Sequence, residues 1–227
     1  IAISDIRSSY PSTLELLRLL RNVRVGGMLS GKKGILHLHL GALSSKMDML
    51  FELVENYEFP IQHISPTHVG RTLELFEQAI IFAKMGGMID ITTGASKYTD
   101  PYKSVLHALD SGASIDNLTF SSDGNAGLDK LDENNNLIGF KSAPFDKNLE
   151  EVINLHLKGG VSFEESIKII TSNPAKNLGL KTKGHIRKNY DADICFFDTN
   201  YNLQTVIANG KFMMKNEKLI QKGSFEK

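Results

Sequence analysis

Residues 64–94 read ISPTHVGRTLELFEQAIIFAKMGGMIDITTG, in which a buried strand, an amphipathic helix and a second strand follow one another. The helical part carries apolar residues at intervals of three and four, and glycines separate it from the next strand. A strand, helix, strand order of this kind is typical of parallel sheets in α/β proteins. Functional residues of such sheets collect at the carboxyl ends of the strands.

The same alternation extends on both sides of this stretch. It predicts five strands in all, each but the last followed by a helix of its own: IAISDIR (1–7), ILHLHL (35–40), ISPTHV (64–69), MIDITTG (88–94) and NLTFSSD (117–123). The first helix is expected in PSTLELLRLLRNVRV, ending at Gly26-Gly27. We therefore predict an α/β fold in which residues 1–180 form the C-terminal part of a (β/α)8 TIM barrel. A full barrel takes about 250 residues, and the first residue is Ile1 rather than Met. We accordingly expect the N-terminal strands to be missing from this chain.

The last part of the chain has a different pattern. Residues 181–227 contain short β-like segments, and Asn209-Gly210 is a dipeptide typical of two-residue hairpin turns. We predict a small β-sandwich segment here, with Cys195 in its core. A polar run at 128–139 is predicted to form a solvated hairpin.

Composition narrows the possible partners. The 227 residues include 26 basic and 26 acidic side chains, so the formal net charge is zero. A neutral chain gives no support for binding to nucleic acid or to acidic membranes, and small-molecule chemistry is favoured. The single cysteine excludes an internal disulfide, which favours a cytoplasmic location. No apolar stretch approaches the roughly 20 residues of a membrane helix.

Three side chains at predicted strand ends are candidate metal ligands. They are His39, His68 and Asp123. Each has an ordinary alternative, since lone strand histidines are usually structural and Asp-Gly often forms a turn. His37 lies deeper in its strand and is expected to pack inside the barrel. The three ligands together predict a hydrolytic metal site in which Asp123 also transfers protons.

Two arginines follow predicted strand ends. The guanidinium groups of Arg7 and Arg71 are suited to holding substrate carboxylates through paired hydrogen bonds. The alternative is a rim salt bridge, for which Asp5 and Glu74 are nearby partners.

The order of these residues and the segments TSNPAKNLGL, KGHI and DADICFFD resemble the amidohydrolase superfamily. Within it, the chain is similar to the isoaspartyl dipeptidase (β-aspartyl peptidase) family through AISDIRS, RVGGMLSGKKG, PTHVGR, LFEQAIIFAKMGGMIDITT, LTFSSDGN and GKFMMKNEKLIQKGSFE. The resemblance implies a metallopeptidase with two zinc ions per subunit that cleaves β-aspartyl dipeptides. It also implies a homo-oligomer, for which an octamer is one form.

The resemblance assigns roles to individual residues. His39 and His68 would bind the second zinc, and Asp123 would bind the first zinc and act as general base. Arg7 and Arg71 would bind the charged ends of the substrate. A carboxylated lysine that bridges the two ions is expected directly before Ile1.

One position departs from the family pattern. Gly127 stands where the family has a serine that contacts the substrate. Recognition there would use a main-chain N–H or Ser122 instead.

We therefore expect a metal-activated hydroxide that hydrolyses β-aspartyl dipeptides. One alternative is an amidohydrolase acting on cyclic amides, like dihydroorotase or hydantoinase. Another is a barrel that binds without catalysis. The pair Arg7 and Arg71 favours a substrate with two charged ends.

Overall fold

A computed structural model describes residues 1–3, 11–41, 43–94 and 97–223 of the chain. These residues form two compact units, Ile1–Gly179 and Leu180–Lys227. No helix within the described ranges is both long and apolar enough to cross a membrane.

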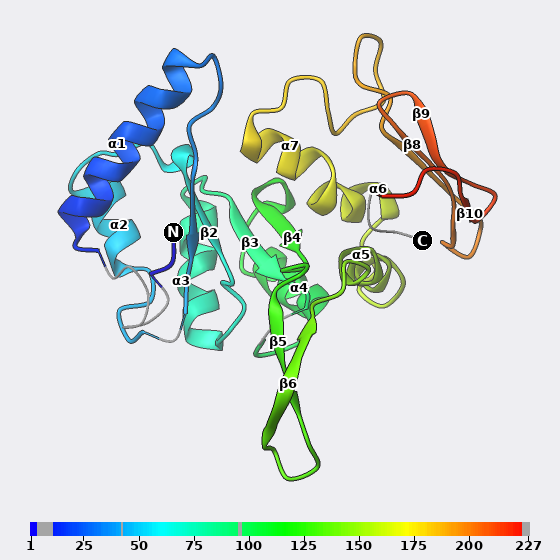
Figure 1. Ribbon diagram of the computed structural model, residues 1–227. Coiled ribbons are helices and arrows are strands. Elements are labelled where there is room, and N and C mark those ends of the chain that lie inside the picture. Colours follow the sequence, from blue (N-terminus) through cyan, green and yellow to red (C-terminus); the bar gives the residue numbers. More distant parts are fainter. Residues whose placement is uncertain (4–10, 42, 95–96, 224–227) are drawn as a thin grey trace. The chain divides into compact units, whose positions relative to one another are not determined.

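The first unit is built on a parallel sheet of four short strands in sequential order (Figure 1). The strands are β1 (Leu36–His39), β2 (Ile64–Thr67), β3 (Ile89–Thr92) and β4 (Leu118–Ser121). Ala2 pairs in parallel with His39 at the free edge of β1. The parallel arrangement predicted from the sequence is confirmed for these strands, while residues 4–7 of the first predicted strand lie outside the described residues.

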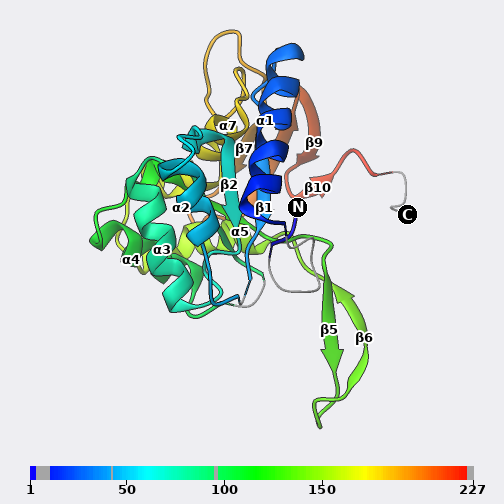
Figure 2. The ribbon, with the colours of Figure 1, turned by 90° about the vertical axis from the view of Figure 1, so that its left-hand side faces the viewer.

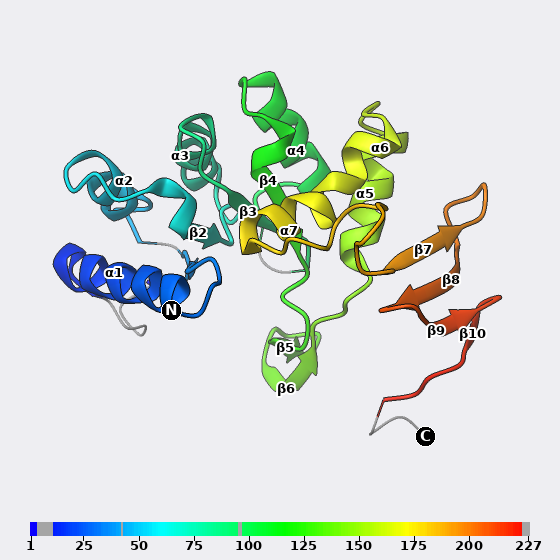
Figure 3. The same cartoon turned by 90° about the horizontal axis from the view of Figure 1, so that it is seen from above.

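Helices separate the strands along the chain and cover the outer side of the sheet (Figure 3). They are α1 (Thr13–Leu29), α2 (Asp48–Glu55), α3 (Leu73–Lys84) and α4 (Pro101–Asp110), with short 3-10 helices η1 (Ile61–His63) and η2 (Ile115–Asn117) leading into β2 and β4. After β4 come α5 (Lys147–Leu157), α6 (Phe163–Ser166), the 3-10 helix η3 (Ile167–Ile170) and α7 (Ser172–Leu178). This order is that of repeated strand and helix units.

Apolar and polar residues alternate along these strands, because successive side chains point to opposite faces. The apolar face packs together with residues of the helices to form the buried core. It consists chiefly of Leu36, Leu38, Ile64, Ile89, Ile91, Leu118 and Phe120. The opposite face carries His37, His39, Ser65, Thr67, Asp90, Thr92, Thr119 and Ser121. The fold therefore places a continuous polar surface on the inner side of the sheet.

Helix α1 corrects one prediction. It begins at a capping box formed by Ser12 and Glu15, but it runs through Gly26-Gly27 to Leu29 instead of ending there. Gly27 is buried, and a Cβ at this position would collide with the backbone of Gly34. The glycine therefore serves close packing of the following loop against the helix, and not helix termination.

A β-hairpin interrupts the first unit after β4. Strands β5 (Gly127–Leu131) and β6 (Leu137–Ser142) are antiparallel and project from the rest of this unit (Figures 1 and 2). The solvated hairpin predicted for this run is confirmed.

The second unit is an antiparallel sheet in the order β10-β9-β8-β7. Its strands are β7 (Ile194–Phe197), β8 (Leu203–Ala208), β9 (Lys211–Lys215) and β10 (Lys218–Leu219). Asn209 and Gly210 both have positive φ, 48° and 76°, as the predicted two-residue hairpin turn requires. Cys195 is exposed, so its prediction as a core residue is wrong. Within the described part of this unit there is a single sheet, and no second layer covers β7.

Candidate metal site

The carboxyl ends of the strands line an open cavity of about 370 Å³. His39 is the last residue of β1, His68 directly follows β2, and Asp123 comes two residues after β4. The cavity is lined by His37, His39, Thr67, His68, Phe120, Ser121, Ser122, Asp123, Gly124 and Asn148. All three predicted ligands therefore face one cavity.

The two histidines direct ring nitrogens at each other. Nδ1 of His39 and Nε2 of His68 are 2.9 Å apart. Two nitrogens bound to one tetrahedral zinc ion at about 2.0–2.1 Å lie about 3.3–3.4 Å apart. The rings would thus separate by only about 0.4–0.5 Å to admit the ion. This pair fits a shared metal.

The other ring nitrogen of His68 also has a partner. Nδ1 lies 2.7 Å from the hydroxyl oxygen of Thr92, at the end of β3. In the tautomer whose Nδ1–H donates to this oxygen, the lone pair of Nε2 is directed at His39. Metal-bound histidines are commonly oriented in this way. Thr92 was missed as a functional residue from the sequence, although its polar position in the alternation of β3 is the signal that marks it.

Both imidazoles have lowered pKa values. Burial, and next the charge of Arg71, lower the pKa of His68 to about 4. Burial, and next His37, lower the pKa of His39. Neutral imidazole is the form that binds metal. Both rings are therefore in the binding form at neutral pH.

Two of the predicted ligands have left-handed backbone conformations. The φ angles are 63° at His68 and 53° at Asp123. Such conformations cost on the order of 1–3 kcal/mol for residues other than glycine and concentrate at functional sites. Gly124, next to Asp123, lies against the exposed ring of Phe145, which a Cβ at this position would displace.

Asp123 lines the same cavity as the histidines and is close enough for its charge to act on both rings. Across the described residues, however, no three His, Cys, Asp or Glu side chains converge closely enough to hold a metal ion. The structure thus brings His39 and His68 together and places Asp123 on the wall of their cavity.

Arg71 stands beside this pair. Its charge acts on both His39 and His68, and its Nε is buried without a hydrogen-bond partner in the described part of the chain. Within that part, Arg71 makes no salt bridge, so the rim pairing with Glu74 is not seen. An unsatisfied buried guanidinium nitrogen is costly unless a ligand completes it. Arg7 and Asp5 lie outside the described residues.

Gly127 begins β5 and is exposed. A Cβ placed on it would meet nothing within 4 Å. Ser122 is buried and lines the cavity near Asp123. Close packing therefore does not require glycine at position 127.

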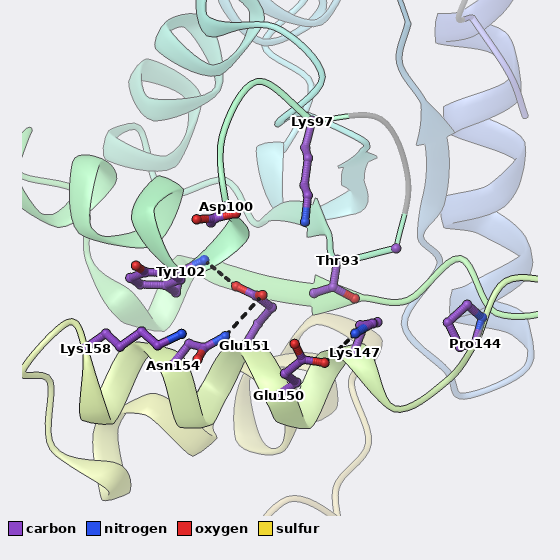
Figure 4. A pocket seen from close by; sticks show the side chains of 11 residues that line it. Thr93, Lys97, Asp100, Tyr102, Pro144, Lys147, Glu150, Glu151, Asn154 and Lys158 are labelled. Carbon is purple, nitrogen blue, oxygen red and sulfur yellow. Dashed lines mark hydrogen bonds and ion pairs between the residues drawn. The ribbon is translucent and has the colours of Figure 1, made fainter. Parts of the chain in front are cut away.

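A second cavity of about 370 Å³ lies between the N-terminal end of α4 and helix α5 (Figure 4). Among its charged lining groups, Lys147 pairs with Glu150 at 2.5 Å, and Asp100 pairs with Lys103, which does not line the cavity, at 2.9 Å. Its buried carboxylate, Glu151, accepts a hydrogen bond from the backbone N–H of Tyr102 at 2.9 Å. The hydrogen bond from Tyr102 to Glu151 connects α4 to α5, and we interpret this cavity as structural.

The parallel α/β fold of the first unit is that of a hydrolase family. Residues 30–223 match the amidohydrolase family, and the chain belongs to it.

Two solved structures extend this result. The β-aspartyl dipeptidase of the thermophilic keratin-degrading Fervidobacterium islandicum AW-1, in complex with β-Asp-Leu dipeptide, is 39% identical, with a TM-score of 0.88 over 100% of this chain and 60% of that chain. A second structure of the β-aspartyl dipeptidase from this organism is 36% identical, with a TM-score of 0.85 over 100% of this chain and 57% of that chain. The resemblance found in the sequence is confirmed, and this chain spans about 60% of the length of these relatives.

More distant proteins share the fold alone. Atrazine chlorohydrolase from Arthrobacter aurescens TC1, complexed with zinc, is 14% identical, with a TM-score of 0.53 over 91% of this chain and 49% of that chain.

Proposed function

We propose that this protein is a metal-dependent hydrolase that cleaves β-aspartyl dipeptides. The observation that carries the proposal is the pairing of His39 Nδ1 with His68 Nε2 at 2.9 Å, at the carboxyl ends of adjacent parallel strands. Both imidazoles are neutral at pH 7, and an acidic side chain shares their cavity. This arrangement suits zinc, with Asp123 proposed as a further ligand.

The substrate class is supported by the relatives and by Arg71. The structure of the Fervidobacterium enzyme holds β-Asp-Leu. In this chain the buried, unpartnered Nε of Arg71 is ready to bind a carboxylate beside the metal site. We propose that Arg71 and Arg7 bind the two charged ends of such a dipeptide. Two guanidinium groups favour a dipeptide with two charged ends over a neutral cyclic amide.

The proposed roles of the residues follow from their positions. Two zinc ions, when bound, would supply a water of lowered pKa and polarise the scissile carbonyl. His39 and His68 would hold one ion, with Thr92 orienting His68. Asp123 accepts the proton of the attacking water and passes it to the departing amine. That second transfer matters because an amide nitrogen leaves readily only when it is protonated.

We further propose that residues 1–180 form part of a (β/α)8 barrel and residues 181–227 part of a β-sandwich. The inner row of polar side chains and the outer helices support the barrel. We also propose that the protein is cytoplasmic and forms a homo-oligomer.

The test is hydrolysis of β-Asp-Leu and α-Asp-Leu by the zinc-loaded protein. Cleavage of the β-linked peptide alone is expected. Asp123→Asn should lower kcat by orders of magnitude while substrate binding persists, since the amide side chain cannot take up the proton. Cleavage of neither peptide with zinc bound would direct attention to cyclic amides, and an absence of zinc binding would contradict the hydrolase itself.

A further inference from the structure

Asp90 is a fully buried carboxylate that the proposed chemistry does not use. It lies on β3 with its side chain on the polar inner face of the sheet, and 6% of its surface is exposed. In the register of the sheet, Asp90 is opposite Thr67 on β2 and Thr119 on β4, and Thr67 is in turn opposite His39. The carboxylate therefore belongs to the same row of side chains as one of the proposed metal ligands.

Three hydroxyl groups donate hydrogen bonds to this carboxylate. Thr67 and Ser121 reach Oδ2 at 2.6 and 2.5 Å, and Thr119 reaches Oδ1 at 2.8 Å. Burial raises the pKa of Asp90, whereas these hydrogen bonds act in the opposite direction. A buried carboxylate with this many donors is well satisfied. Asp90 thus joins three strands through one side chain.

The connection is made where the backbone pairing is weakest. In the described strands, β1 with β2 and β3 with β4 pair along their whole lengths, whereas β2 and β3 share one register pair, Thr67 with Asp90. The hydrogen bond from Thr67 to Asp90 therefore strengthens the contact between β2 and β3, the neighbouring strands with the fewest backbone pairs. Any loosening there would change the distance between the ends of β2 and β4.

Those two strand ends present the proposed ligands. Thr67 directly precedes His68, and Ser121 comes two residues before Asp123. Both ligands have left-handed backbones, His68 directly after β2 and Asp123 two residues after β4, so their placement depends on how the strand ends are held. We propose that Asp90 is a positioning residue whose buried carboxylate fixes the separation of the strand ends carrying His68 and Asp123, and thereby the fit of the metal.

This role rests on the proposed metal site and is tested by metal binding, with Co²⁺ as the probe. Asp90→Asn keeps the shape of the side chain but replaces one acceptor oxygen by an NH₂ donor, so at least one hydroxyl loses its partner. We expect Co²⁺ affinity to fall about 10- to 100-fold, as for other residues that orient ligands. The visible absorption bands of the bound Co²⁺ should also change, because they report its coordination geometry.

The matched control is Asn173→Ala. The amide of Asn173 donates to the carbonyl oxygens of Ile115 and Leu118, both at 2.8 Å, at the opposite end of β4 from Asp123. This variant should lower resistance to urea and leave the Co²⁺ affinity and spectrum unchanged. Thr67→Val and Thr67→Ser give a second comparison that does not depend on folding of the Asp90 variant. The valine should weaken Co²⁺ binding and the serine should preserve it.

The outcomes separate the two proposals. Co²⁺ binding by the unaltered protein, with equal affinity and spectrum in Asp90→Asn and in Thr67→Val, would overturn the positioning role and leave the metal site standing. The positioning role would also be overturned if Asn173→Ala lost as much Co²⁺ affinity as Asp90→Asn at the same loss of stability. Failure of the unaltered protein to bind Co²⁺ would overturn the metal site and the role of Asp90 with it.

Discussion

Replacing Thr92 with valine removes the oxygen to which His68 Nδ1 is bonded at 2.7 Å, with almost no change of side-chain volume. Because His68 is 4% exposed, its N–H would be left buried without a partner. An unsatisfied buried donor costs about 1–3 kcal/mol. The ring would also be free to turn or to change tautomer, and loss of such an orienting partner typically lowers metal affinity about 10- to 100-fold.

The assay is zinc affinity measured by competition with a chelating indicator, alongside urea unfolding of the metal-free protein. Thr92→Ser is the matched control, because it keeps the hydroxyl and removes only a methyl group. The serine variant should bind zinc nearly as tightly as the unaltered protein. Equal affinities of the valine and serine variants would refute the reasoning that Thr92 orients His68.

Three other predictions follow from the structure. Gly127→Ser should fold normally, because a Cβ there meets nothing within 4 Å, and should lower KM for β-Asp-Leu if the family's serine contact is regained; an unchanged KM would argue against that contact. In the metal-free protein, the pKa of His68 is about 4 in the folded state against 6.5 ordinarily, so the unfolded state binds more protons between these values. The free energy of unfolding should therefore be highest above pH 6.5 and fall by at most roughly 3 kcal/mol as pH drops toward 4. In urea unfolding, His68→Gln should show a flatter pH dependence. In α1, Gly27→Ala should cost about 1–3 kcal/mol by overlap with Gly34. By contrast, Gly26→Ala, where a Cβ meets nothing within 4 Å, should stabilise the helix by about 0.5–1 kcal/mol; equal thermal shifts in the two variants would contradict the packing role.

The sequence was sufficient to predict the parallel strands and the placement of the histidines. Period and length identify strands and helices, and the ends of parallel strands necessarily meet at one edge of the sheet. His39 and His68 could therefore be assigned to the same edge of the sheet from their positions in the sequence.

Features that depend on contacts between distant segments were beyond this reasoning. Gly27 resembles a helix stop in the local sequence, and only the approach of Gly34 shows that it is a packing residue. Cys195 lies in an apolar run, but whether that run is buried depends on a second layer that the local pattern does not reveal. Asp90 looks like an isolated acid within a strand until the register places three hydroxyl groups around it.

The left-handed backbone at Asp123 makes the residue needed for the proposed chemistry less favourable for stability than glycine. At a φ of 53°, glycine would avoid the steric penalty that aspartate carries, and the half-buried side chain has little packing to lose. A laboratory selection that rewards heat resistance alone would therefore be drawn toward glycine at this position, and the proposed proton carrier would be lost in the process. Retention of aspartate requires that catalysis be selected together with folding.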